Sequence, residues 1–152
     1  MTPFTKTVVA ASAGSLALRA GAFLFQALGY APCKLCLWQR WPHAIAVAAG
    51  VIIWIFGVRK LAWVGAFAAL TTAGLGIFHS GVEQGYWTGP TTCTSSALTN
   101  ISTEELLDQI LAAPLIRCDE IAWSLLGLSM ASWNAIISLL LAALWVAAAR
   151  RA

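Results

Sequence analysis

Two cysteines and an arginine in the segment PCKLCLWQR (residues 32–40) are the residues best suited to carry chemistry. Cys33 and Cys36 have the CxxC spacing of a dithiol, and Arg40 follows four residues after Cys36. Apolar sequence begins just after the pair, so both cysteines are expected near a helix N-terminus, with Arg40 one turn along on the same face as Cys36. The helix N-terminus and the guanidinium both favour the thiolate, which is the reactive form of cysteine. The segment therefore favours redox catalysis.

Two further cysteines, Cys93 and Cys118, leave three roles open for the four thiols. A bridge between Cys93 and Cys118 would constrain a long loop, whereas a bridge within the CxxC pair removes little chain entropy and makes a poor structural staple. A zinc site of four thiolates needs two closely spaced pairs, and the second pair is widely spaced, so we expect no metal. Of the three possible pairings, the spacing favours Cys33–Cys36 with Cys93–Cys118.

The composition indicates which elements must position these residues. The chain has 152 residues, of which 60% are hydrophobic and only 10% are charged, whereas a soluble domain is normally about 25% charged. Lipid is therefore the expected solvent for most of the surface. The net charge of +3 comes from scattered basic residues, a pattern that does not indicate nucleic-acid binding. All six acidic residues lie between residues 80 and 132, which indicates an aqueous segment.

Four apolar runs are close to the length of about 20 residues that a membrane-spanning helix needs. Only a helix satisfies all of its backbone polar groups within a single segment in lipid. We therefore predict an all-α membrane protein, a four-transmembrane-helix bundle that forms one domain over residues 1–152. The predicted spans are residues 8–29, 41–58, 61–79 and 133–149, and the outer loops are residues 30–40 and 80–132. The linker GVRK is short enough to require an antiparallel hairpin of the second and third helices.

Basic residues set the expected orientation, because loops rich in lysine and arginine stay in the cytoplasm. The basic residues at the relevant ends of the apolar runs are Lys6, Arg59, Lys60, Arg150 and Arg151. This pattern places both termini in the cytoplasm and all four cysteines outside, where disulfide chemistry is common. The first run continues through AGAFLFQALGY, which favours a span over a cleaved signal peptide.

Two histidines and one arginine within the apolar runs are further candidates. His79 ends the third run, so it is expected at the depth of the CxxC pair and Arg40, which makes it a candidate site residue. His43 lies three residues after Arg40 and is expected to pack within the bundle; a haem between the two histidines has little support. Arg19 lies within the first run with no acidic residue in any span to pair with it, so we expect it to reach the membrane surface or face the bundle interior, outside the site.

The second outer loop has a helix signal of its own. In STEELLDQILAAP, Ser102 and Glu105 form a capping box, apolar residues follow at helical spacing, and Pro114 ends the run. We therefore expect a short amphipathic helix in this loop, lying either along the membrane surface or against the bundle.

Three segments together resemble the disulfide bond formation protein B (DsbB) family, bacterial inner-membrane quinone reductases that reoxidise DsbA. They are PCKLCLWQRWPH, IFHSGVEQGYWTGPTTC and CDEIAWSLLGLSMASWN. The resemblance covers nearly the whole chain and looks closer to the alphaproteobacterial branch. It implies a membrane thiol:quinone oxidoreductase with ubiquinone or menaquinone as cofactor. It also implies a DsbA-like periplasmic thiol oxidase as partner and the bacterial inner membrane as location.

The resemblance implies roles for individual residues as well. Cys33 and Cys36 match the cysteine pair beside the quinone. Arg40 and His79 match residues associated with quinone binding. The family often has an acid before the arginine, whereas this chain has Gln39, so a proton relay at that position is not implied.

The second cysteine pair is implied to exchange with the partner. Cys93 matches the residue that forms the mixed disulfide with DsbA, and Cys118 matches its companion in the loop. Two alternatives stay open at this point. One is a non-catalytic membrane scaffold whose disulfides brace the outer loops, and the other is a paralogue dedicated to a single partner protein.

Overall fold

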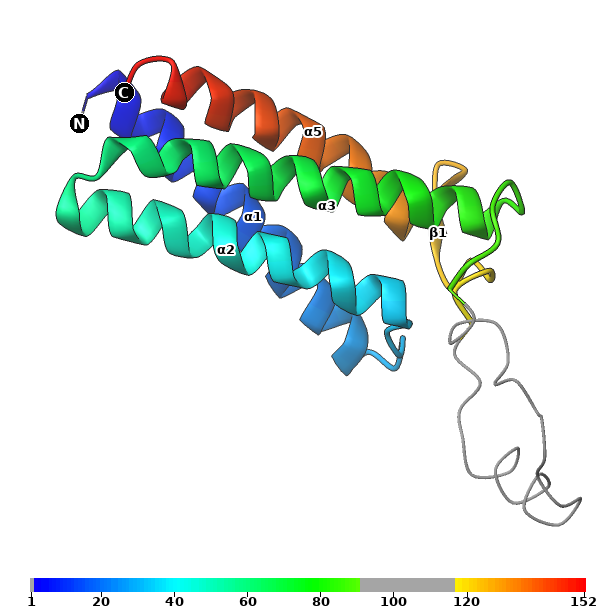
Figure 1. The fold of residues 1–152 in the computed structure, drawn as a ribbon. Coiled ribbons are helices and arrows are strands. Elements are labelled where there is room, and N and C mark those ends of the chain that lie inside the picture. The colour runs from blue at the N-terminus through cyan, green and yellow to red at the C-terminus, as the bar shows by residue number, and fades with distance from the viewer. Residues whose placement is uncertain (1, 91–116) are drawn as a thin grey trace, which may run out of the picture.

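The computed structural model describes residues 2–90 and 117–152, and its long helices lie side by side in a bundle (Figure 1). They are α1 (Pro3–Ala27), α2 (Lys34–Phe56), α3 (Ala62–Glu83) and α5 (Met130–Ala149). α1 and α3 each pack against both α2 and α5, so the four helices close into a ring. The helical bundle that the apolar runs predict is therefore present in the described residues.

The connections between the helices determine which elements lie at each end of the bundle. The 3-10 turn η1 (Arg59–Leu61) joins α2 to α3, after Gly57 has ended α2 with a φ of 69°. That left-handed conformation costs glycine little because it has no Cβ. The antiparallel hairpin predicted from GVRK is thus confirmed. Both termini lie at this end of the bundle, and the first turn of α2 lies at the other (Figure 1).

Within residues 2–90 and 117–152, three helical segments are long and apolar enough to cross a membrane. They are Pro3–Ala27, Arg59–Glu83 and Met130–Ala149. α2 has 23 residues and packs between α1 and α3, but its first half carries Gln39, Arg40 and His43, which lower its hydropathy. Three of the predicted spans therefore have a matching apolar helix, and the second predicted span, residues 41–58, stays a prediction.

The helices extend beyond the predicted spans at the end opposite the termini. α2 begins at Lys34, so Cys36 and Arg40, predicted in an outer loop, lie in the first two turns of a helix. α3 continues past His79 to Glu83. Helices that protrude from the span bring polar residues from two elements to one level, which is the condition for a site at this end.

A short β-hairpin that the sequence did not lead us to expect precedes α5. Strands β1 (Ser124–Leu125) and β2 (Leu128–Ser129) pair antiparallel, and the turn between them has positive φ at Leu126 (54°) and Gly127 (77°). This is the pattern of a two-residue hairpin loop, which requires left-handed residues at both central positions. The amphipathic helix predicted near Ser102 lies outside the described residues.

Small residues let α3 and α5 approach closely, as their abundance in the apolar runs predicts. A Cβ added at Gly76 would lie 3.0 Å from the backbone nitrogen of Ala135 and 3.1 Å from the carbonyl oxygen of Ala131. A Cβ at Gly65 would lie 2.5 Å from the ring of Trp145, which is fully buried. The α3–α5 interface therefore has no room for larger side chains at these glycines.

This close approach predicts a large difference between two neighbouring glycines. Gly76→Leu should destabilise the bundle by about 1–3 kcal/mol, because overpacking forces backbones apart. Gly74 has no atom within 4 Å of an added Cβ and is exposed on the outside of the bundle, so Gly74→Leu serves as the matched control and should not lower stability. Thermal unfolding in detergent micelles measures both; equal melting temperatures would contradict the packing described.

Candidate active site

The first turn of α2 is capped by the cysteine pair itself. Cys33 is the N-cap residue, with extended backbone, and its sulfur accepts the backbone N–H of Cys36 at 3.2 Å. Sulfur here takes the place of the side-chain oxygen that usually caps a helix. The two Sγ atoms lie 2.9 Å apart, with Cys33 buried and Cys36 partly exposed. The CxxC sequence thus fixes both thiols at the positive end of the helix.

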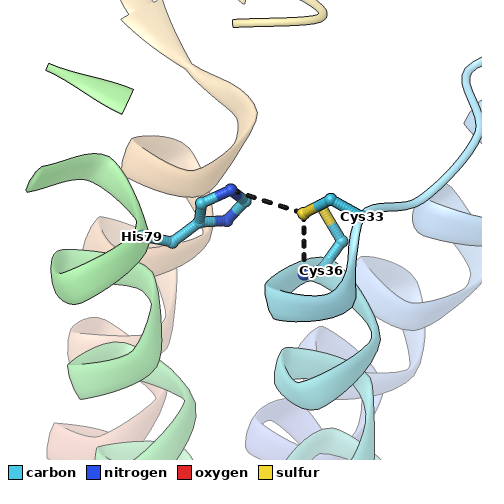
Figure 2. A group of neighbouring side chains, drawn as sticks. All are labelled: Cys33, Cys36 and His79. Carbon is cyan, nitrogen blue, oxygen red and sulfur yellow. Dashed lines mark hydrogen bonds between the residues drawn. The ribbon is translucent and has the colours of Figure 1, made fainter. Parts of the chain in front are cut away.

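His79 comes from α3 and turns its ring toward the cysteines, as Figure 2 shows. Its Nε2 atom lies 3.5 Å from the Cys33 sulfur, and the reactive atoms of the three side chains all lie within 4.8 Å of one another. The side chain of His79 is 3% exposed. The structure therefore brings His79 to the level of the CxxC pair, as its position in the sequence predicts.

Gln39 determines which nitrogen of His79 carries the proton. The Gln39 amide nitrogen lies 3.2 Å from the carbonyl oxygen of Leu35 and 2.9 Å from His79 Nδ1. Because the carbonyl can only accept, the NH₂ group must face this side and donate to Nδ1 as well. Neutral His79 then carries its proton on Nε2, toward the Cys33 sulfur. This arrangement directs an N–H donor toward the Cys33 sulfur.

The two thiols differ in their ionisation. The hydrogen bond that Cys33 donates to the Cys36 sulfur lowers the pKa of Cys36, and the charge of Arg40 lowers it further, against the effects of burial and of Glu83. The same hydrogen bond, together with burial, raises the pKa of Cys33. Cys36 is therefore the thiolate of the pair, and Cys33 is the thiol that stabilises it.

The lowered pKa of Cys36 predicts the pH dependence of its alkylation. A thiolate with a depressed pKa persists at pH values where an ordinary thiol is protonated. A free cysteine loses reactivity below its pKa of about 8.5, whereas iodoacetamide should still modify Cys36 well below that pH. Cys33, with its raised pKa, should stay unmodified at the same pH. Mass spectrometry of the reduced protein after short exposures between pH 5 and 9 measures both. Preferential modification of Cys33 would contradict the assignment.

Arg40 is held against α1 and keeps one donor free. Its Nη1 donates to Gln26 Oε1 at 2.7 Å, its Nη2 donates to the carbonyl oxygen of Ala22 at 3.2 Å, and its guanidinium lies 4.9 Å from the ring centre of Phe23. The Nε atom is buried and has no hydrogen-bond partner among the described residues. A buried donor without a partner is costly in a folded protein, so Nε is available to a bound acceptor.

A cavity of about 290 Å³ lies beside these groups. Its lining includes four predicted site residues: Cys33, Cys36, Arg40 and His79. The remaining walls are mainly apolar and come from α1, α2, α5 and the segment before the hairpin, with Leu18, Phe25 and Trp123 among them. A mostly apolar cavity with a few convergent polar groups is the usual form of a small-molecule site.

The second cysteine pair is represented by Cys118 in the described residues. Cys118 is fully buried and packs in one cluster with Cys33, Leu35 and Val82. A thiol from the second loop therefore lies in the same buried cluster as the CxxC pair. Cys93 lies outside the described residues, so the pairing Cys93–Cys118 stays a prediction.

Comparison with known proteins agrees with this arrangement. The family model described as "Disulfide bond formation protein DsbB" matches residues 5–148. This chain belongs to the DsbB family. It is also similar to the "Uncharacterized protein RP370" of Rickettsia prowazekii (strain Madrid E), with 25% identity over 118 residues, 74% of this chain and 67% of that protein. No solved structure matches the chain significantly. Membership of the DsbB family means a membrane protein of disulfide-bond formation, as the resemblance of its motifs predicts.

The structure adds polar residues to the cavity of this DsbB-family chain that sequence reasoning left out. Arg19 was predicted to lie outside the site, but it lines the cavity and donates from Nη1 to the carbonyl oxygen of Arg40 at 2.8 Å. Glu83 lies one turn after His79, with Oε1 3.9 Å from His79 Nε2. The lining also includes Gln39, His43 and Asn134. A signal for these residues existed, since polar side chains in apolar runs usually face the bundle interior.

Proposed function

We propose that the chain is a membrane thiol:quinone oxidoreductase that reoxidises a DsbA-like periplasmic thiol oxidase. Two electrons pass from the partner through Cys93–Cys118 and Cys33–Cys36 to ubiquinone or menaquinone. The observation that carries the proposal is the shared cavity: Cys36, Arg40 and His79 all line one mostly apolar space, and Arg40 has a buried Nε–H without a partner among the described residues. The chain acts as one domain of four spans in the bacterial inner membrane, with both termini in the cytoplasm.

The residues present fit a quinone. Its ring is apolar on both faces and suits walls such as Leu18, Phe25 and Trp123. Its carbonyl oxygens accept hydrogen bonds, and the free Nε–H of Arg40 supplies a donor that the protein leaves unused. When bound, the quinone supplies the two-electron oxidant that this chain lacks. Arg40 would hold one ring oxygen, and the apolar walls would hold the ring close to Cys36.

The protein's own part is the oxidation of one dithiol. Cys36 acts as the thiolate, and the Sγ of Cys33 lies 2.9 Å from it. A bond forms between the two sulfurs, and the pair loses two electrons and the one proton that remains on Cys33. Together with the proton that Cys36 released when it ionised, this balances the two electrons and two protons that a quinone takes up to become a hydroquinone. His79 directs its Nε2–H toward Cys33 and so stabilises negative charge on that sulfur as its proton leaves.

The position of Cys118 supports transfer between the two cysteine pairs. Reduced partner attacks Cys93 and forms a mixed disulfide, which leaves Cys118 as the thiol of the second pair. Because Cys118 packs in the same buried cluster as Cys33, the two sulfurs that would exchange lie in one part of the protein. The direction of electron transfer follows from the reduction potentials. DsbA is a strong oxidant at about −120 mV, so only a more oxidising acceptor, such as a quinone, reoxidises it.

Quinone consumption by the purified protein tests this proposal. With reduced DsbA and a soluble ubiquinone or menaquinone analogue, the full-length protein in detergent should reduce the quinone, followed by its ultraviolet absorbance. A Cys118→Ala variant should accumulate a mixed disulfide with the partner. If no quinone is consumed and no mixed disulfide forms, the scaffold alternative is supported. If a different periplasmic protein is trapped, the chain is a paralogue dedicated to that protein.

A further inference from the structure

His43 is a buried histidine in the cavity wall that the mechanism above does not use. It lies on α2, three residues after Arg40, and is 3% exposed. Its Nε2 lies 2.9 Å from Asn134 Oδ1 and 3.2 Å from Thr72 Oγ1. Its Nδ1 is buried and has no partner in the described structure. One nitrogen of the ring is therefore fully engaged and the other is free.

The orientation of Asn134 shows that it presents oxygen, not nitrogen, to His43. The Asn134 amide nitrogen lies 2.7 Å from Gln39 Oε1 and 3.4 Å from the carbonyl oxygen of Thr72. Both of these oxygens can only accept, so the NH₂ group faces them. The orientation of Gln39 is fixed in turn by the carbonyl of Leu35, as described above. Asn134 Oδ1 can only accept, so His43 Nε2 must donate to it.

The second neighbour of His43 leads to the same assignment. Thr72 donates its single hydroxyl proton to the carbonyl oxygen of Gln39 at 3.1 Å, so its oxygen is left as an acceptor for His43 Nε2. A neutral imidazole has one N–H. With that proton on Nε2, the Nδ1 atom is a buried lone pair on a residue that lines the cavity.

Among the described residues that line the cavity, three buried polar atoms have no hydrogen-bond partner: the donor Arg40 Nε and the acceptors His43 Nδ1 and Glu83 Oε2. The oxygens of a quinone only accept hydrogen bonds, so a quinone leaves both acceptors unsatisfied. The oxygens of a hydroquinone both donate and accept, so a hydroquinone can accept from Arg40 and donate to His43. Leaving a buried acceptor unsatisfied carries a penalty, whereas a hydrogen bond to it is favourable.

We propose that His43 Nδ1 is a hydroxyl-binding subsite that makes the cavity prefer the reduced form of its quinone ligand. The inference rests on the proposed function and names a residue that distinguishes the product from the substrate. Gln39, Thr72 and Asn134 act as positioning residues, because they hold the proton of His43 on the nitrogen remote from the ligand. Preferential binding of the reduced ring favours electron transfer from the dithiol within the complex.

Equilibrium binding of the two forms of one ligand tests the subsite. The probes are decylubiquinone and its hydroquinone, titrated anaerobically by calorimetry into full-length Cys36→Ser protein in lipid nanodiscs, where no dithiol transfers electrons. The hydroquinone should bind about five- to tenfold more tightly than the quinone, the effect of one net hydrogen bond. In the same background, His43→Phe should remove most of this preference, because phenylalanine has no acceptor, whereas Glu83 is unchanged.

Two further variants control for structure. His43→Gln should keep most of the preference, because its amide N–H replaces the bond to Asn134 and its oxygen replaces Nδ1 as acceptor. Leu18→Ala changes an apolar part of the wall, so it should weaken both forms equally and leave the ratio unchanged. The subsite is overturned if a folded His43→Phe protein keeps the preference for hydroquinone over quinone. It is also overturned if Leu18→Ala changes this preference as much as His43→Phe does.

Nitrogen NMR of the histidine rings gives a readout that does not depend on substitution of His43 or Leu18. The chain has two histidines, so labelling gives four ring signals. In Cys36→Ser protein, His43 should show a protonated Nε2 and an Nδ1 lone pair. Hydroquinone should shift the Nδ1 signal toward a hydrogen-bonded acceptor, and quinone should not. A protonated Nδ1 overturns the inference. If neither form of the ligand binds at all, the proposed function fails instead.

Discussion

Cys36→Ser is expected to lower the rate at which this DsbB-family protein reduces quinone to the uncatalysed rate. Cys36 is the thiolate of the pair, because Cys33 donates a hydrogen bond to its sulfur and Arg40 adds a positive charge. Serine has nearly the same size but its hydroxyl neither ionises at neutral pH nor forms a disulfide. Without that sulfur, Cys33 has no partner 2.9 Å away with which to release two electrons.

The loss is measured by following quinone absorbance with a small dithiol reductant or the reduced partner as electron source. Retained quinone binding and an unchanged melting temperature of the Cys36→Ser protein show that the cavity and the fold are intact. A variant that still turns over at a rate near that of the wild type would contradict the assignment of Cys36 as the electron donor.

Arg40→Met is expected to raise the KM for quinone about 10- to 100-fold. A hydrogen bond from a charged donor contributes about 1.5–3 kcal/mol, and each 1.4 kcal/mol corresponds to a factor of about ten in affinity. The variant also removes a charge that favours the Cys36 thiolate, so alkylation of Cys36 should require a higher pH. Arg40→Lys should recover the pH dependence better than the KM, since lysine keeps the charge and loses the planar donor geometry.

Arg59→Met is the matched control for this experiment. Arg59 lies at the opposite end of the bundle, where it donates from Nη2 to the carbonyl oxygen of Arg151 and lies 4.4 Å from the ring centre of Phe4. It makes one backbone hydrogen bond and one aromatic contact, much as Arg40 does, but far from the cavity. Its loss should leave the KM for quinone unchanged. Equal effects of the two substitutions would indicate a general loss of packing.

The helices and the central residues of the site could be predicted from the sequence, because the patterns that indicate them involve residues close together in the chain. The apolar runs indicate helices at three spans that the structure supports, and GVRK predicts the hairpin of α2 and α3. The CxxC spacing and Arg40 lie on consecutive turns of one helix, so their proximity follows from helical geometry alone. The position of His79 could be predicted as well, because the alternation of spans brings the end of α3 to the start of α2.

The polar contacts behind the site could not be predicted, because they join residues far apart in the chain. Gln39 and Asn134 are separated by 95 positions, and only the rotation of α2 and α5 about their axes decides that their amides meet. Hydropathy alone does not distinguish a polar residue that faces the interior from one near the membrane surface. For this reason the sequence left open whether Arg19 reaches the membrane surface or faces the interior: its partner is a backbone carbonyl of Arg40, which no side-chain pattern reveals.

The hairpin before α5 was missed for a different reason. The pairing of Ser124 with Ser129 spans only two residues on each side, too short for an alternating pattern. Gly127 provides a turn signal, but Leu126 adopts a positive φ that leucine rarely adopts. The indole of Trp133 donates to the carbonyl oxygen of Leu125 at 3.1 Å, so a contact from α5 helps to hold the turn. Tertiary structure thus overrides local preference here.

The most direct test of the central claim is a single turnover of the CxxC pair alone. Full-length Cys93→Ser/Cys118→Ser protein, with only Cys33 and Cys36 left, is reduced, freed of reductant and mixed anaerobically with ubiquinone in lipid nanodiscs. We predict that each chain reduces one quinone and that mass spectrometry then finds a disulfide between Cys33 and Cys36. Quinone that stays oxidised beside two free thiols, in protein that binds it, would contradict electron transfer from this pair.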